Sequence, residues 1–138
     1  MGTIVQKKLY RIVDANFNRA KEGLRVCEDI CRFVLDEQAA TQKYKLLRHQ
    51  LTKAMSSLNV GQVVAARDIE GDVGRSPLGS EFKRREVADI FYANSQRAKE
   101  SIRVLEEFAK LWSARLANHL KAIRYQIYAL EKKIVAKL

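Results

Sequence analysis

The chain has 138 residues, of which 26 are Lys or Arg and 16 are Asp or Glu, and its formal net charge is +10. Its 47% apolar content argues against disorder, and its apolar runs are too short to cross a membrane. The positive charge predicts a phosphate-bearing partner: a nucleic acid, a membrane surface or a small phosphorylated ligand. Two cysteines cannot form a disulfide scaffold and no leader pattern opens the chain, so a cytoplasmic protein is expected.

Apolar residues recur at steps of three and four, and only one Pro and six Gly interrupt the chain, which favours long helices. Four helices are expected, over Lys7–Asp36, Ala39–Leu58, Ser80–Trp112 and from near Ser113 onward. In the first, the apolar stripe runs to Cys31 and Val34, and in the third Ser80 is a candidate N-cap. The expected fold is all-α: a four-helix bundle forming a single domain over residues 1–138.

Four of the six glycines and the only proline lie within Gly61–Gly79. A connection of about twenty residues exceeds the ~2–8 usual between bundle helices, and long loops are often functional. One interpretation is a short extra helix over Val60–Arg67 followed by an ordinary linker. The other is a functional loop over residues 59–79, and the charged run Arg67–Arg75 favours it.

The third helix repeats the first. Nine of the fourteen positions in Ala15–Glu28 are identical in Ala93–Glu106, at an offset of 78 residues. Leu47–Leu51 and Ile123–Ile127 match more weakly at an offset of 76. The pattern predicts two pseudo-twofold-related helical hairpins, over about 7–58 and 80–137, joined by the Gly-rich loop.

Each copy places an asparagine and an arginine on the apolar face, with a glutamate three residues beyond the arginine: Asn16, Arg19 and Glu22 in the first, and Asn94, Arg97 and Glu100 in the second. Burying them costs several kcal/mol unless they are paired, and each glutamate is the expected partner of its arginine. The two sets either fix the register of the bundle or line an inter-helix ligand cavity. Arg48 is expected to reach inward to an anion, whereas Lys21 and Lys99 are expected on a solvated face.

The loop gathers residues suited to a phosphate and its metal. Arg67 can form paired hydrogen bonds with phosphate oxygens. Asp68 and Asp72 are oxygen ligands of the kind that holds Mg²⁺ beside a polyphosphate. Gly71 and Gly74 let backbone N–H groups approach an anion. An acidic turn would look similar, so the residues alone leave phosphoryl transfer and a structural turn equally open.

Through motifs spread over nearly its whole length, the chain resembles the helical domain found alone or fused ahead of thiamine phosphate synthase, a family identified as monofunctional hydroxymethylpyrimidine phosphate kinases. The motifs stand at Arg11–Asp29, Leu47–His49, Ala66–Gly74 and Ala93–Glu107. The resemblance implies ATP-dependent phosphorylation of hydroxymethylpyrimidine phosphate to the diphosphate, for thiamine synthesis.

Given that reaction, chemistry suggests a role for each candidate residue. Arg67, Asp68 and Asp72 form the catalytic set, with the two aspartates as Mg²⁺ ligands. The remaining candidates bind the phosphates or the aminopyrimidine: Asn16, Arg19, Glu22, Arg48, Gly71, Gly74, Asn94, Arg97 and Glu100. The glutamates hold the arginines, and the ionised acceptor phosphate needs no strong base.

Two alternatives without catalysis are a nucleic-acid-binding module and a partner-binding module for a thiamine enzyme, including the synthase. The charge distribution favours small ligands over nucleic acid, because Gln38–Val60 and Ser113–Leu138 together hold +9 and the acidic Gly61–Gly79 lies between them. Apolar residues off the main stripes (Leu24, Ile102 and Tyr128) are candidates for a homo-oligomer contact.

Overall fold

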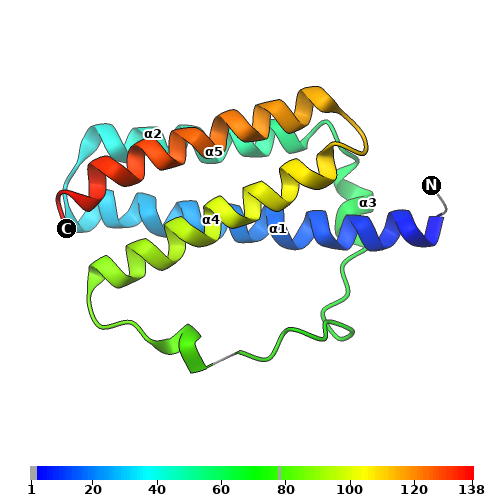
Figure 1. Ribbon diagram of the computed structural model, residues 1–138, viewed down its shortest axis with the longest axis horizontal. Helices are drawn as coiled ribbons and strands as arrows, with labels where there is room; N and C mark the ends of the chain where they lie inside the picture. Colours follow the sequence, from blue (N-terminus) through cyan, green and yellow to red (C-terminus); the bar gives the residue numbers. More distant parts are fainter. Residues whose placement is uncertain (1–2, 78) are drawn as a thin grey trace.

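The computed structural model describes residues 3–77 and 79–138, and all of their regular elements are helical, which confirms the all-α class (Figure 1). In chain order they are α1 (Thr3–Asp29), the π-helical turn η1 (Ile30–Val34), α2 (Gln38–Met55), α3 (Val60–Ala65), the 3₁₀ turn η2 (Gly79–Phe82), α4 (Val87–Ala109) and α5 (Ala114–Val135). Within the described residues, no helix is long and apolar enough to cross a membrane.

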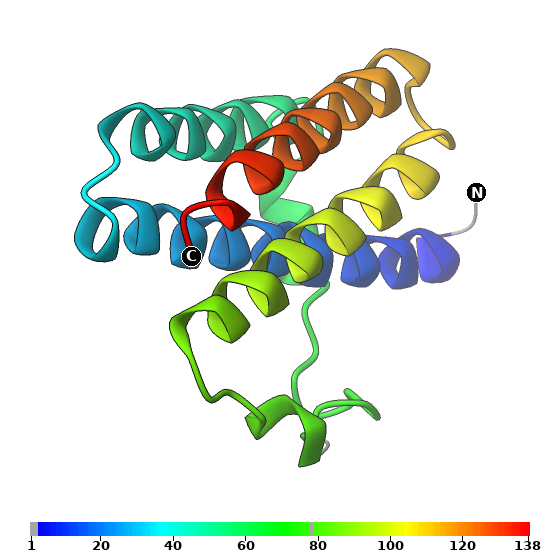
Figure 2. The same ribbon diagram turned by 60° about the vertical axis from the view of Figure 1, so that its left-hand side comes forward.

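The four long helices share one apolar core. Helix α1 packs on α2 and α4, and α5 packs on α2 and α4, while the short α3 lies against α1. Figures 1 and 2 show α1 and α4 crossing, with the connection between α3 and α4 extending to one side of the helices. The completely buried side chains of this core include Tyr44 of α2, Phe91 of α4, and Leu120 and Ile127 of α5.

In α2 and α5 the apolar residues at steps of three and four are buried, among them Tyr44, Leu47 and Leu51 in α2 and Leu120, Ile123 and Ile127 in α5. The predicted end of the first stripe is wrong. Val34 is 53% exposed. The N–H of Leu35 donates to the carbonyl of Ile30, five residues back, so the last turn is wider than an α-turn. That extra residue rotates Val34 away from the face that Ile30 and Cys31 share.

The third helix begins at Val87 rather than Ser80, and its N-cap is Glu86. The Asp89 carboxylate accepts the backbone N–H of Glu86 at 3.0 Å, while the Glu86 side chain accepts the Asp89 N–H, so the two form a capping box. The predicted cap at Ser80 is wrong because that residue lies in the separate turn η2. The expected start near Ser113 is confirmed for α5, whose Ser113 side chain accepts the Leu116 N–H.

The short extra helix expected in the Gly-rich connection is confirmed, but it ends before the predicted Arg67. A short helix is present at Val60–Ala65, where the Asn59 side chain accepts the N–H of Gln62. The charged run Arg67–Arg75 has no regular secondary structure. Because α3 packs on α1, the run begins close to α1.

Three expectations about exposure are wrong. Leu24 and Ile102 are completely buried in the core, so neither can form a subunit contact. Lys99 is buried too, and its Nζ donates to both carboxylate oxygens of Glu131, at 3.0 and 2.8 Å. The spacing of residues along α4 could not predict this ion pair, because its carboxylate comes from another helix, α5.

Candidate functional site

A cavity of about 600 Å³ lies between α1 and the segment that follows α3. Its wall includes five of the residues selected from the sequence: Asn16, Arg19, Arg67, Asp68 and Asp72. Lys8, Arg11 and Asp14 of α1 also line it. Residues more than fifty positions apart meet here because α3 packs on α1 and delivers the chain to this face.

A bidentate ion pair fixes the start of the loop on α1. Arg67 donates from Nε and Nη2 to the two carboxylate oxygens of Asp14, both at 2.7 Å. Asp14 is buried and also accepts a hydrogen bond from the Asn18 amide at 3.2 Å. The hydrogen bonds from Arg67 to Asp14, together with the charge of that carboxylate, raise the pKa of Arg67. The guanidinium is therefore always charged, and its Nη1 edge remains free for a ligand.

Asp68 and Asp72 each close a tight turn. An oxygen of Asp68 accepts the N–H of Gly71 at 2.8 Å, and one of Asp72 accepts the N–H of Gly74 at 3.0 Å. The backbone N–H groups of Gly71 and Gly74, which were expected to approach an anion, therefore donate to the aspartates. A side chain at position 71 would collide with Asp68, because an added Cβ would lie 2.3 Å from its Oδ2.

The aspartates alone do not form a metal-binding cluster. Among residues 3–77 and 79–138, no group of three or more His, Cys, Asp or Glu side chains is placed to hold a metal ion. Both aspartates are exposed, and each keeps oxygen lone pairs free of its backbone hydrogen bond.

The cations of α1 complete the wall. Arg11 reaches the carbonyl oxygen of Asp68 from Nη2, at 3.5 Å. The buried Asn16 donates to the Ile12 carbonyl at 2.9 Å, and its side-chain oxygen accepts from exposed Arg19 at 3.4 Å. With Lys8 and Arg67, four cationic side chains line the cavity together with three aspartates, Asp14, Asp68 and Asp72, so the wall keeps a positive excess that suits an anion.

The remaining candidates lie elsewhere. Asn94, Arg97 and Glu100 are on α4, and Glu22 is exposed on α1. The Asn94 amide donates to the Ile90 carbonyl at 2.8 Å, and Glu100 accepts from Gln96 at 2.9 Å. Neither predicted pair, Arg19 with Glu22 or Arg97 with Glu100, forms an ion pair within the described part of the chain.

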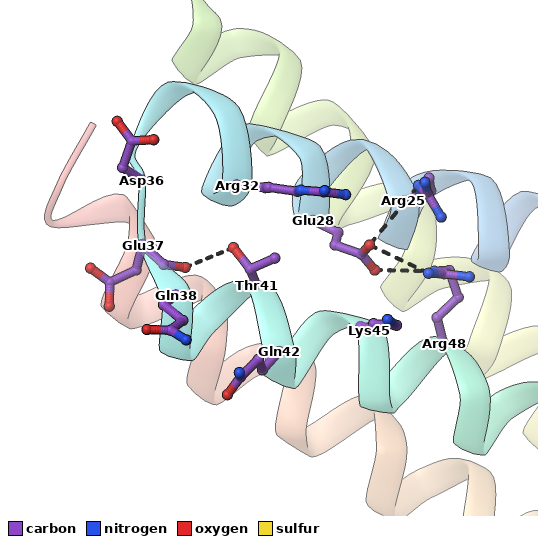
Figure 3. A pocket seen from close by; sticks show the side chains of 10 residues that line it. All are labelled: Arg25, Glu28, Arg32, Asp36, Glu37, Gln38, Thr41, Gln42, Lys45 and Arg48. Carbon is purple, nitrogen blue, oxygen red and sulfur yellow. Dashed lines mark hydrogen bonds and ion pairs between the residues drawn. The ribbon is translucent and has the colours of Figure 1, made fainter.

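Arg48 does point inward, but it meets a carboxylate. Its Nε and Nη2 donate to the two oxygens of buried Glu28, at 3.1 and 3.3 Å (Figure 3). Arg124 makes the same contact with buried Glu106, at 2.8 and 3.2 Å. Both arginines join the two helices of their own hairpin.

Sequence reasoning missed Lys8, Arg11 and Asp14, and the duplication explains why. At an offset of 78, their counterparts are Glu86, Asp89 and Tyr92, so a search for repeated residues discards them. The positions at which the two halves differ were more informative than the repeated ones. Where the halves differ, α1 carries cavity residues and α4 carries its capping box.

Fold and site together define a small all-helical protein whose longest helix forms a cationic cavity with a carboxylate-bearing loop. The chain belongs to the ThiD2 family, and the family match covers residues 11–133.

The curated relatives are longer proteins. A thiamine-phosphate synthase of Nostoc punctiforme is 39% identical over 132 residues, which are 95% of this chain and 36% of the relative. A thiamine-phosphate synthase of Rhodopirellula baltica is 37% identical over 139 residues, covering 100% of this chain and 37% of the relative. The chain thus spans little more than a third of these relatives. Comparison with the solved structures finds no match.

Proposed function

We propose that the protein takes part in thiamine biosynthesis as a kinase that phosphorylates hydroxymethylpyrimidine phosphate to the diphosphate, with ATP as donor. The observation that carries this proposal is the cavity between α1 and the loop, which is lined by four cationic side chains, by the two exposed aspartates Asp68 and Asp72, and by Asp14, the partner of Arg67. Family membership and the names of the longer relatives support the pathway.

In this reaction an oxygen of the substrate phosphate attacks the γ-phosphorus of ATP, the bond from that phosphorus to the β–γ bridging oxygen breaks, and ADP leaves. Catalysis of such a transfer is mainly positioning and charge neutralisation. Arg67, with the edge that Asp14 leaves free, and Arg19 bind phosphate oxygens, while Lys8 and Arg11 add positive charge. The acceptor is already ionised, so no general base is required.

Mg²⁺ fits the two aspartates. Mg²⁺ is usually held by one or two carboxylates together with substrate phosphates and water rather than by an all-protein cage. Asp68 and Asp72, exposed on the cavity wall, supply that number of carboxylates, and their contacts with Gly71 and Gly74 hold them in place. When bound, the ion would neutralise charge on the polyphosphate.

We further propose that the two hairpins are copies of one unit related by a pseudo-twofold axis. The matching bidentate pairs, Arg48 with Glu28 and Arg124 with Glu106, support it, since the same atoms donate in both. The amides of Asn16 and Asn94 likewise both donate to the carbonyl four residues earlier. In the single-domain arrangement proposed for 1–138, the helix residues that line the cavity beside the loop come from the first copy.

The test is ADP formation with ATP, Mg²⁺ and hydroxymethylpyrimidine phosphate. Wild-type protein should form ADP only when the pyrimidine phosphate is present. Asp72→Ala should abolish turnover while the Tm stays nearly unchanged. Arg67→Ala should also abolish turnover, but it should lower the Tm because it leaves the buried Asp14 carboxylate without its partner. Glu70→Gln is the matched control, because its side chain is 94% exposed and lies outside the cavity wall. Folded wild-type protein that forms no ADP would overturn the kinase proposal.

A second candidate is a partner-binding module without catalysis. It is favoured by the fact that relatives named thiamine-phosphate synthase carry this segment as 36% or 37% of their length. Stable co-purification with a thiamine-phosphate synthase, without ATP turnover, would support this candidate over the kinase.

A further inference from the structure

A second cavity, of about 470 Å³, lies at the other end of the first hairpin, between α1 with η1 on one side and α2 on the other. Its size is within the ~300–1,000 Å³ range of small-ligand sites. Four of its lining residues are cationic: Arg25, Arg32, Lys45 and Arg48. Figure 3 shows Arg32 on the η1 wall and Lys45 on the facing α2 wall.

Of the seven charged residues on this wall, four are paired, and Arg32, Lys45 and Asp36 form no ion pair within the described residues. Arg48 is bound to Glu28, and Glu37 accepts a 2.7 Å hydrogen bond from Lys137. Arg25 lies 3.5 Å from the carboxylate of Asp29. Within the described residues, Arg32 and Lys45 form no ion pair.

Besides the paired Glu28 and Glu37, Asp36 is the one acidic residue on this wall, so the unpaired charges give a positive excess. Thr41, Gln38 and Gln42 add neutral hydrogen-bonding groups around it. Cations confined in a concave site focus a positive potential toward an incoming anion.

The corresponding positions of the second hairpin have different partners. The counterpart of Arg32 is Lys110, which donates to both oxygens of Glu107, at 3.2 and 2.7 Å. The counterpart of Lys45 is Lys121, whose Nζ lies 5.7 Å from the centre of the Tyr125 ring. The guanidinium carbon of Arg32 lies 4.7 Å from the centre of the Phe33 ring, so the two hairpins differ at this position in the carboxylate partner: Lys110 has one, and Arg32 has none among the described residues. A contact with a ring face leaves the N–H donors of Arg32 available to an anion.

We propose that this cavity binds a small multivalent oxyanion, a diphosphate or a dicarboxylate, between Arg32 and Lys45. It is a site separate from the one between α1 and the loop. Asp14 and Glu28 are fourteen residues apart on α1, which is about 20 Å along a helix. An anion held here is out of reach of phosphoryl transfer at the first site, so it would act as an effector rather than as a substrate.

The experiment titrates pyrophosphate and, separately, succinate into the ¹⁵N-labelled full chain and follows the backbone amides of Gln38–Lys45. At least one probe should shift these amides in a saturable way, and the tighter one identifies the ligand class. The double variant Arg32→Gln/Lys45→Gln should weaken that binding by at least about tenfold, since it removes two charge-assisted contacts. Both side chains are exposed, so the variant should fold, as its amide spectrum will show.

The matched control is Lys110→Gln/Lys121→Gln, which removes the same charge at the corresponding positions of the second hairpin. It should bind the probe as the wild type does. Unshifted Gln38–Lys45 amides with both probes would overturn the proposal, and so would equal weakening by the two double variants. Asp72→Ala should leave this titration unchanged, so failure of the kinase proposal and failure of this one are distinguishable.

Discussion

At the scale of single residues, the geometry of Arg67 depends on a neighbour that the sequence patterns did not indicate. A guanidinium offers two hydrogen-bonding edges, and Asp14 occupies the one formed by Nε and Nη2. The other edge can then point in only one direction, because Asp14 is itself buried in α1. We infer that Asp14 positions Arg67 without touching the substrate.

Asp14→Asn should therefore reduce turnover without unfolding the protein. A neutral amide cannot accept from both donors, so Arg67 loses its fixed orientation, and misplacing a phosphate ligand by about 1 Å costs roughly 100-fold in rate. Steady-state kinetics should show kcat reduced, with Asp14→Glu recovering part of it. Unchanged kcat in Asp14→Asn would show that the ion pair only anchors the loop.

Tyr44 carries a polar group that its surroundings do not satisfy. The residue is completely buried, and its hydroxyl has no hydrogen-bond partner among the described residues. An unpaired buried hydroxyl costs about 1–3 kcal/mol. Tyr44→Phe should therefore leave the free energy of unfolding unchanged or raise it by about 1 kcal/mol, as measured by urea denaturation. Destabilisation would instead reveal a partner such as a bound water.

At the scale of elements, hydrophobic periodicity predicted the buried faces of α2 and α5, and local geometry decided where prediction failed. Val34 fits an α-helical stripe, but the π-helical turn at Ile30–Val34 changes the residue spacing and exposes it. Ser80 has good N-cap chemistry, yet the helix starts where Glu86 and Asp89 can cap it reciprocally. Neither effect leaves a periodic signal in the sequence.

The capping box of α4 makes a pH-dependent prediction. Hydrogen bonds from the backbone N–H groups of Arg85 and Glu86 lower the pKa of Asp89 below its ordinary value. A carboxylate with a lowered folded pKa stabilises the protein above its unfolded pKa, and that contribution is lost as the pH falls through the folded pKa.

Asp89→Asn should thus have a lower Tm than the wild type at pH 7. The difference should shrink as the pH falls below about 4, the ordinary range of aspartate. Thermal unfolding followed by circular dichroism at pH 7, 5 and 3 measures it, with Glu70→Gln as the exposed control. A difference in Tm that stays constant over this range would contradict a role for the ionised carboxylate.

At the scale of the whole molecule, the duplication drew attention to two residues of the cavity wall, Asn16 and Arg19, and hid others. Arg67, Asp68 and Asp72 were identified from the chemistry of the loop alone, and the structure places them beside Asn16 and Arg19. Lys8, Arg11 and Asp14 were missed because the second half does not repeat them and because they meet the loop only through the packing of α3 on α1, a contact between distant segments.

The two hairpins meet where α1 crosses α4, and this contact depends on one missing side chain. A Cβ at Gly23 would lie 2.7 Å from the carbonyl oxygen of Asn94 and 3.3 Å from the backbone nitrogen of Ala98, and neither backbone atom can move without shifting α4. Gly23→Ala should therefore destabilise the protein by about 1–3 kcal/mol, the usual cost of overpacking a core, despite the better helix propensity of alanine.

Gly61→Ala is the matched control, because Gly61 lies within α3 and an added Cβ would meet only the Asn59 side chain, at an ordinary 3.5 Å. There the propensity gain should prevail and stabilise the protein by about 0.4–1 kcal/mol. Urea denaturation of both variants measures the pair. Shifts of opposite sign would establish that the close approach of α1 and α4, rather than glycine flexibility, decides the effect at position 23. A Gly23→Ala variant as stable as the wild type would show that α1 and α4 can move apart without loss.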